Sequence, residues 1–207
     1  ASSLYGSEAV GGLINIQTRT PETAPRLLLD AYGTTWGEMN VDAGTAGKIG
    51  KGHYLLSGNY FRYGSPTDRN GDGFTDLTLQ HRGGIFARYA VPLANGENMR
   101  LGARLLAENR FGGQMDFTPA MRGSDSLYGE HIQTRRGEFF WATPFRLGKT
   151  LYTAAGAFSG HLQDSYYGTT GYAAQQYIGF AQITGTHKWN ERHNTLHGIA
   201  ARYTYYD

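Results

Sequence analysis

The stretch MRLGARLLAEN, residues 99–109, decides the fold because its side chains alternate in polarity. Its apolar members share one face of an extended strand: Met99, Leu101, Ala103, Leu105 and Ala107. Polar residues and one glycine share the other face: Arg100, Gly102, Arg104 and Glu108. Side chains of a β-strand point alternately to opposite sides, so one face of this segment suits hydrocarbon and the other suits water. We therefore predict a β-strand between two different surroundings.

The same unit, a run of about ten alternating residues followed by a turn, repeats along the chain after Pro25. Nine runs can be marked: Leu27–Thr35, Met39–Ala46, His53–Tyr63, Arg82–Val91, Met99–Asn109, Thr134–Thr143, Thr150–His161, Gln175–His187 and Thr195–Tyr206. The fourth and ninth runs alternate clearly, whereas Leu55 and Phe180 interrupt the polar faces of the third and eighth. The sequence predicts an all-β chain of nine antiparallel strands.

Such alternation also occurs in a soluble antiparallel sheet with one solvated face. The connectors favour a membrane barrel instead, because short and long ones take turns along the chain. The short connectors are 47–52, 92–98, 148–149 and 188–194, and the long polar ones are 64–81, 110–133 and 163–174. Only the first connector on the long side, 36–38, is brief. Short periplasmic turns opposite long external loops are typical of an outer-membrane barrel.

Aromatic residues gather near the ends of the runs, as they do at the two interfaces of a membrane barrel. Examples are Tyr60, Tyr63, Trp141, Trp189, Tyr203, Tyr205 and Tyr206. Tyrosine also has a high intrinsic preference for strands, so this signal is weaker than the connector pattern. Together the two features favour a transmembrane β-barrel over a soluble sandwich.

Composition excludes several classes of protein. The 207 residues include 30 Gly and 15 Tyr, with 40% hydrophobic residues, which is typical of a β-rich chain. No run approaches the ~18 apolar residues that a membrane-spanning helix needs, whereas a membrane-spanning strand needs only about 9–11. The net charge of +2 is spread along the chain, so nucleic-acid binding is poorly supported. The absence of Cys excludes disulfides and thiolate metal sites.

The first 21 residues, ASSLYGSEAVGGLINIQTRTP, carry a dense glycine-containing motif. The motif resembles the signature YGS-x-A-x-GG-x-I-N-I-x-T, which closes the plug domain of TonB-dependent outer-membrane receptors. The matching positions are Tyr5, Gly6, Ser7, Ala9, Gly11, Gly12, Ile14, Asn15, Ile16 and Thr18. The resemblance implies a plug-to-barrel junction at Tyr5, Gly6, Ser7, Gly11, Gly12 and Asn15. It divides the chain into the end of a plug, residues 1–22, and the N-terminal part of a barrel, residues 23–207.

Three further segments resemble barrel segments of the cobalamin-receptor-like branch common in the Bacteroidetes: Arg110–Met115, Tyr128–Glu130 and Ala201–Asp207. The resemblance implies about nine strands of a barrel of about 22. Since the last run ends at Asp207 without a turn, we expect the chain to be a segment of a longer protein.

The family's activity is the uptake of a large, scarce nutrient across the bacterial outer membrane. The resemblance therefore implies cobalamin first, with an iron siderophore or haem close behind. The implied partners are the TonB–ExbB–ExbD energy-coupling complex, outer-membrane lipid and the nutrient itself, with a surface lipoprotein as a further candidate. The sequence contains no nucleotide-binding motif and gives no reason to expect haem as a resident cofactor.

The segment DRNGDGFTD, residues 68–76, follows the first nine positions of a calcium-binding loop. The predicted ligands are Asp68, Asn70, Asp72, the carbonyl of Phe74 and Asp76. The pattern departs from an EF-hand at its twelfth position, where Leu79 replaces the bidentate Glu. The alternative is an Asn-Gly and Asp-Gly turn that needs no ion. Connector counting places this loop on the external side, and the resemblance implies calcium there.

Aromatic and charged residues in the long connectors are candidates for substrate contact: Arg122, Tyr128, Tyr166, Tyr167 and Tyr172. His131 and His161 are weaker candidates for a ligand contact. We expect no enzyme and no catalytic residues, since the chain lacks a G-x-S-x-G elbow, an H-E-x-x-H motif and a phosphate-binding loop. The alternative function is a calcium-stabilised, secreted β-sheet module that binds glycan or protein.

Overall fold

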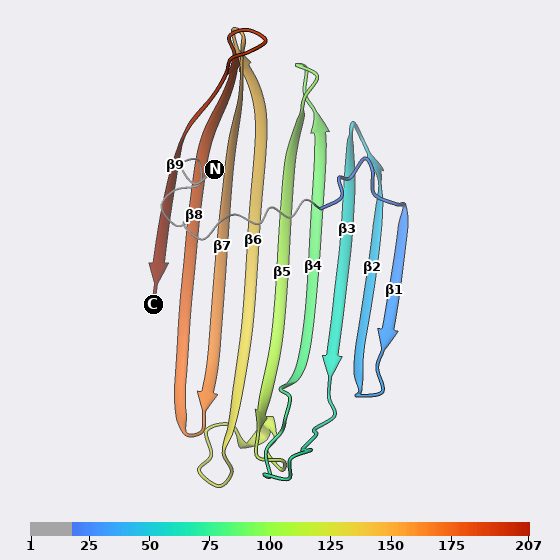
Figure 1. The fold of residues 1–207 in the computed structure, drawn as a ribbon, viewed down its shortest axis with the longest axis vertical. Helices are drawn as coiled ribbons and strands as arrows, with labels where there is room; N and C mark the ends of the chain where they lie inside the picture. The colour runs from blue at the N-terminus through green and yellow to red at the C-terminus, as the bar shows by residue number, and fades with distance from the viewer. Residues whose placement is uncertain (1–17) are drawn as a thin grey trace.

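The computed structural model describes residues 18–207 and folds them into one sheet of nine antiparallel strands (Figure 1). The strands lie side by side in chain order, β1 to β9, so that every neighbour in sequence is a neighbour in space. The bounds are β1 Leu27–Gly33, β2 Glu38–Ile49, β3 Gly52–Tyr63, β4 Leu79–Pro92, β5 Asn98–Gly113, β6 Gly129–Leu147, β7 Thr150–Tyr167, β8 Thr170–Lys188 and β9 Asn194–Tyr206.

Helical structure in the described part of the chain is confined to one 3-10 turn, η2, at Pro119–Met121. No helix among residues 18–207 is long and apolar enough to cross a membrane. The predicted all-β chain of nine antiparallel strands is therefore confirmed. The predicted plug-to-barrel junction residues, from Tyr5 to Asn15, lie outside the described residues.

One predicted loop is wrong. The connector predicted at 163–174 is a two-residue turn at 168–169, because β7 continues to Tyr167 and β8 begins at Thr170. Gln163 and Asp164 pair with Ala174 and Ala173, and Gly168 takes the positive φ of +60° that the turn requires. Two long connectors remain at that end of the sheet, residues 64–78 and 114–128, and the connectors at the opposite end are short.

The pairing register gives the sheet two chemically different faces. Because register fixes which side chains share a face, each row can be followed across all the strands. What we call the apolar face carries the odd-numbered side chains of β1, β2, β4, β5, β6, β8 and β9 and the even-numbered ones of β3 and β7. One row of it reads Leu29, Ala43, Gly58, Ile85, Leu105, Gly137, Gly160, Tyr177 and Tyr205.

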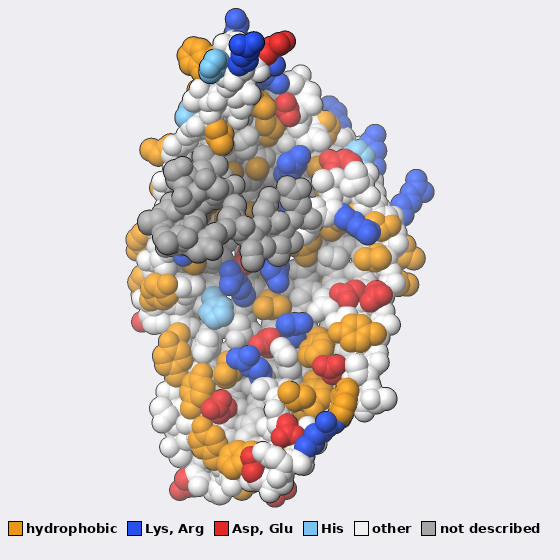
Figure 2. Space-filling model, in the orientation of Figure 1, with side chains coloured by type: hydrophobic (Ala, Val, Ile, Leu, Met, Phe, Trp, Pro, Cys, Tyr) orange, Lys and Arg blue, Asp and Glu red, His pale blue; other side chains and the backbone are white. Residues whose placement is uncertain are grey.

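The opposite side, which we call the charged face, carries the other side chains. One row of the charged face, directly next to the row of Leu105 described for the apolar face, reads Asp42, Asn59, Gly84, Leu106, Arg136, His161 and Gln176. Figure 2 shows Lys, Arg, Asp and Glu side chains over the middle of the sheet. The faces predicted for the fourth, fifth and ninth runs agree with this register, and Leu55 and Phe180 do lie on the charged face.

Glycines inside the strands are covered by aromatic rings from the neighbouring strand. Directly opposite pairs are Gly47 with Tyr54, Gly102 with Phe140, Gly156 with Trp141, Gly160 with Tyr177 and Gly185 with Tyr152. A Cβ added at Gly102 would lie 2.2 Å from the Phe140 ring, and one at Gly156 would lie 2.7 Å from Trp141. A ring over a glycine restores packing that the strand lacks and fixes the register.

The described residues enclose almost no apolar core. Their buried hydrophobic side chains are Ala46, Tyr63, Leu79, Ala90 and Phe117, which lie near strand ends or in a loop. Large side chains in the middle of the apolar face are instead exposed, including Leu29 at 69%, Ile85 at 55% and Ile199 at 75%. A sheet normally buries its apolar face against another layer, and within residues 18–207 no second layer covers this one.

Candidate functional site

The most extensive chemical feature of the molecule is the apolar band on the apolar face. In β5 the band extends from Met99 to Ala107, the length of about 9–11 residues with which a strand crosses a membrane. A polar row ends it toward the long loops: Arg62, His81, Asn109, Gln133 and Asp164, each paired with the next. The border between apolar and polar rows therefore runs straight across β3 to β7.

The middle of the charged face is rich in arginine. Five of the arginines of β4 to β6 lie there: Arg82, Arg88, Arg100, Arg104 and Arg136. The Phe86 and Phe140 rings stack at 6.3 Å, and the Arg88 guanidinium lies 5.5 Å and 5.8 Å from their centroids. The cation–π contacts stabilise the Phe86 and Phe140 rings among the charged side chains of this face.

Acidic and amide groups occupy the same face on β2 and β3. The Asn59 side-chain amide donates to Asn40 at 3.0 Å and to Asp42 at 2.8 Å, and the Asn40 amide donates to Asp42 at 2.6 Å. This network satisfies polar groups that water would otherwise have to solvate. The charged face is thus acidic near β1 and β2 and basic across β4 to β6.

The two long loops are joined to each other. Phe74 of the first pairs with Gln114 of the second as an isolated bridge, and the Met115 N–H donates to the Gly73 carbonyl at 2.9 Å. The Phe74 and Tyr128 rings lie 6.4 Å apart. The loops therefore form one cap at this end of the sheet, which Figure 1 shows at the bottom.

Two of the predicted substrate-contact residues come together on the apolar-face side of this cap. Arg122 forms an ion pair with Asp164 of β7, and its guanidinium lies 4.5 Å from the centroid of the Tyr166 ring. The contacts hold the loop of η2 against β7. Arg122 and Tyr166 thus contact each other, Arg122 also pairs with Asp164, and substrate contact by Arg122 and Tyr166 stays a prediction.

The other three predicted substrate-contact residues lie toward the charged face. The Tyr128 hydroxyl donates to Glu130 at 3.1 Å, and this bond raises the pKa of Tyr128. Tyr167 pairs with Glu130 across β6 and β7, and Tyr172 lies opposite Ser165 on the exposed end of the β7–β8 hairpin. The five residues therefore do not form one site, because the sheet separates them into two groups.

His131 lies at the loop end of β6, beyond the apolar band, and is only 2% exposed. Its Nε2 lies 2.7 Å from the Asn109 amide oxygen, whereas its Nδ1 and the Nε of Arg122 are buried without a partner in the described structure. Burial, and then the charge of Arg122, lower the pKa of His131 against an opposing effect of Asp164. Burial also removes His131 from the candidates for direct ligand contact.

The predicted calcium loop adopts a turn in which its carboxylates face backbone amides. Asp68 accepts from the N–H groups of Gly71 at 2.7 Å and Gly73 at 2.9 Å, and Asp72 accepts from that of Phe74 at 2.8 Å. Asp76 accepts from the Arg69 N–H at 2.9 Å. No group of three or more His, Asp or Glu side chains within residues 18–207 is arranged to hold a metal. The conformation agrees with the turn alternative, and calcium binding stays a prediction.

No family model, no curated protein and no solved structure matches this chain. The class that the fold defines is an all-β protein with one open antiparallel sheet of nine strands across residues 18–207, apolar on one face and charged on the other. Any assignment of activity must therefore rest on the chemistry of the two faces and on the motif at residues 5–18.

Proposed function

We propose that the sheet forms part of the barrel wall of a TonB-dependent outer-membrane receptor. Such a receptor takes up a large, scarce nutrient, cobalamin or an iron chelate, with energy supplied through the TonB–ExbB–ExbD complex. The observation that carries the proposal is the uncovered apolar band, which crosses the sheet and ends at a straight polar row. The motif between Tyr5 and Thr18 supports the choice of family.

Lipid explains the exposure of the apolar face better than water does. Soluble monomers rarely expose continuous apolar patches larger than about 300–600 Å². Here large aliphatic side chains are exposed on strands from β1 to β9, among them Leu29, Ile85, Leu105 and Ile199. In an outer-membrane barrel, outward apolar and inward polar side chains alternate along every strand, which is the pattern of this sheet.

The two edges of the sheet, β1 and β9, do not pair with each other. An unpaired backbone edge in hydrocarbon costs several kcal/mol for each open N–H or C=O group. The proposal therefore requires further strands against β1 and β9, as in a barrel of about 22 strands.

In this proposal the charged face lines the lumen. The nutrient then meets Tyr128, Tyr167 and Tyr172 near the loops, and the Arg88 cluster with Phe86 and Phe140 farther in. Aromatic rings and guanidinium groups suit a large solute with flat conjugated parts and carboxylate or phosphate groups. The loop at residues 68–76 lies on the external side, where calcium would order it.

The proposal is tested with a deletion strain complemented by the full-length protein that carries this sequence. Uptake of radiolabelled cobalamin and of a ferric siderophore is measured with and without a proton uncoupler, and in a strain lacking TonB. We expect the protein in the outer-membrane fraction and energy-dependent uptake of one nutrient, lost without TonB. A protein recovered in the soluble fraction, or uptake of neither nutrient, would contradict the proposal.

One observation favours the second candidate, a secreted module that binds glycan. The rings of Phe158, Tyr177 and Tyr205 stack across β7, β8 and β9 at 6.3 Å and 6.4 Å, with interplanar angles of 18° and 28°. A flat aromatic platform also suits the apolar face of a sugar ring. This candidate requires the protein to stay in solution without detergent and to bind oligosaccharide, which the same fractionation tests.

A further inference from the structure

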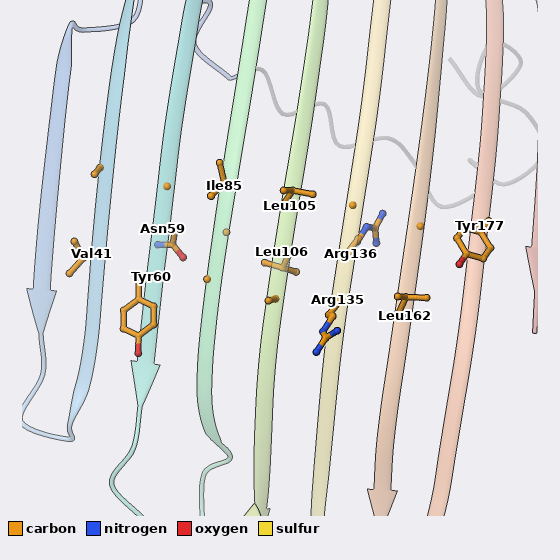
Figure 3. A pocket seen from close by; sticks show the side chains of 17 residues that line it. Val41, Asn59, Tyr60, Ile85, Leu105, Leu106, Arg135, Arg136, Leu162 and Tyr177 are labelled. Carbon is orange, nitrogen blue, oxygen red and sulfur yellow. The ribbon is translucent and has the colours of Figure 1, made fainter.

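A groove crosses the middle of the apolar face, where several strand positions are glycines without a side chain. Gly58, Gly83 and Gly137 form its floor on β3, β4 and β6, and the Tyr177 ring, which covers Gly160 of β7, bounds it on the other side. A Cβ built on Gly83 meets no atom within 4 Å, and one on Gly137 meets only a methyl group of Leu105 at 3.5 Å. Ile85, Leu105, Leu162 and Tyr177 stand around this floor, as Figure 3 shows.

The groove continues into a polar hollow toward the long loops. The two hollows share Tyr60, Gly83, Ala107 and Arg135. The second adds polar groups from the row that ends the apolar band, namely His81, Asn109 and Gln133. Along the strand direction the surface thus changes from hydrocarbon to hydrogen-bonding groups within a single continuous depression.

Arg135 supplies a cation at the junction of the two hollows. It is exposed and forms no ion pair with any residue among 18–207. The carboxylate of the polar row, Asp164, is held by Arg122, and Glu108 projects to the charged face. An unpaired guanidinium beside hydrocarbon attracts an anion, and phosphate matches its paired N–H donors.

We propose that this groove binds a phosphate-bearing lipid of the surrounding membrane. The phosphate lies at Arg135 in the polar hollow that Tyr60 and Gln133 also line, and one acyl chain lies over Gly137 between Leu105, Leu162 and Tyr177. The inference rests on the proposed function, since it requires the apolar face to contact lipid. The headgroup then lies toward the long loops and the acyl chain toward the middle of the bilayer.

A protein partner is a poorer occupant. The groove lies within the apolar band and is only as deep as the side chains that surround glycine. A second copy of this chain would have to bring a carboxylate to Arg135, whereas the one carboxylate within the described strands on the apolar face, Asp164, is already paired with Arg122, and Asp207 lies beyond the end of β9. A single acyl chain fits a trough one side chain deep, and a phosphate supplies the missing charge.

The test is native mass spectrometry of the detergent-purified, full-length protein with added phosphatidylglycerol, and with zwitterionic phosphatidylcholine as the reference lipid. We expect Arg135→Gln and Gly137→Leu each to reduce retention of phosphatidylglycerol at least about tenfold, because one loses the charge-assisted contact and the other fills the trough. Arg104→Gln, on the charged face of β5 and outside the groove, should retain the lipid. Inorganic phosphate alone should not compete, because it lacks the acyl chain.

Equal retention of phosphatidylglycerol by Arg135→Gln and Arg104→Gln would overturn the inference, as would competition by free phosphate or equal retention of the two lipids. If Gly137→Leu does not fold, the comparison of Arg135→Gln with Arg104→Gln alone tests the lipid site. Membrane insertion of every variant without selective lipid retention would leave the proposed function standing and refute only the lipid site. Concentration-dependent dimers that Arg135→Gln abolishes would assign the groove to a second copy instead.

Discussion

Two adjacent leucines of β5 test the proposed barrel, in which Leu105 would face lipid and Leu106 the lumen. Leu105 lies on the apolar face between Ile85 and Gly137 and is 59% exposed, whereas Leu106 lies on the charged face between Gly84 and Arg136. We expect Leu105→Arg to destabilise the membrane-inserted protein strongly. Leu106→Arg adds the same side chain to the same strand, and we expect a small effect from it.

The magnitude follows from the position of Leu105 in the band. The apolar band in β5, from Met99 to Ala107, is centred on Ala103, so the proposed barrel would hold Leu105 close to the bilayer midplane. Arginine on the lipid face at the midplane costs about 2–4 kcal/mol, which lowers the folding equilibrium about 30- to 700-fold. Leu106→Arg meets Arg136 as a like charge in a water-filled lumen, and its cost should stay below about 1 kcal/mol.

The assay is urea-dependent refolding of the full-length protein into lipid vesicles, followed by protease protection. The free energy of unfolding should fall for Leu105→Arg and remain nearly unchanged for Leu106→Arg. Equal losses, or a larger loss for Leu106→Arg, would refute the assignment of the apolar face to lipid.

Three further predictions concern the loops and the strand register. His131 is buried and its pKa is lowered, so below about pH 6.5 the unfolded state binds more protons than the folded state, and the loop at 114–128 loses stability as pH falls. Amide hydrogen exchange in this loop should therefore become faster between pH 7.5 and 5. Protection that does not change with pH, or the same acid response in His131→Gln, would contradict this. Asp72→Ala should abolish calcium binding in isothermal titration of the full-length protein, while Asp125→Ala in the other long loop retains it; an unchanged signal would remove the calcium site. Gly156→Val should displace the Trp141 ring, which a Cβ at this position would approach within 2.7 Å, and should lower the free energy of unfolding by about 1–3 kcal/mol. Gly179→Ala should be tolerated, because a Cβ added at Gly179 meets no atom within 4 Å. Unaltered Trp fluorescence and stability in Gly156→Val would contradict the ring-over-glycine pairing.

Strand number and face assignment could be read from the sequence because both are local properties. Side-chain polarity alternates with a period of two over Met99–Ala107, and this predicts which side chains share a face without any knowledge of the neighbouring strands. The length of the β7–β8 connector is predicted wrongly, because Gln163 and Asp164 are polar and resemble loop residues. Both residues nevertheless belong to the β7–β8 pairing, in which Gln163 lies opposite Ala174 and Asp164 opposite Ala173.

The arrangement of the loop end could not be predicted, because it depends on pairs distant in sequence. Arg122 pairs with Asp164, which is 42 residues away in the sequence, and His131 is buried against Asn109 of another strand. No local pattern distinguishes such a histidine from an exposed one. The groove was missed for the same reason, since Gly58, Gly83, Gly137 and Gly160 become neighbours only through register.

Site-directed spin labelling along β5 tests the central claim most directly, because the sequence contains no cysteine that would add a background label. Single cysteines at positions 100–106 of the full-length protein in membranes would be labelled, and the accessibility of each label to oxygen and to a water-soluble nickel complex measured. The account predicts high oxygen and low nickel accessibility at 101, 103 and 105, and more nickel than oxygen accessibility at 100, 102, 104 and 106. High nickel accessibility at 101, 103 and 105, or no alternation at all, would contradict it.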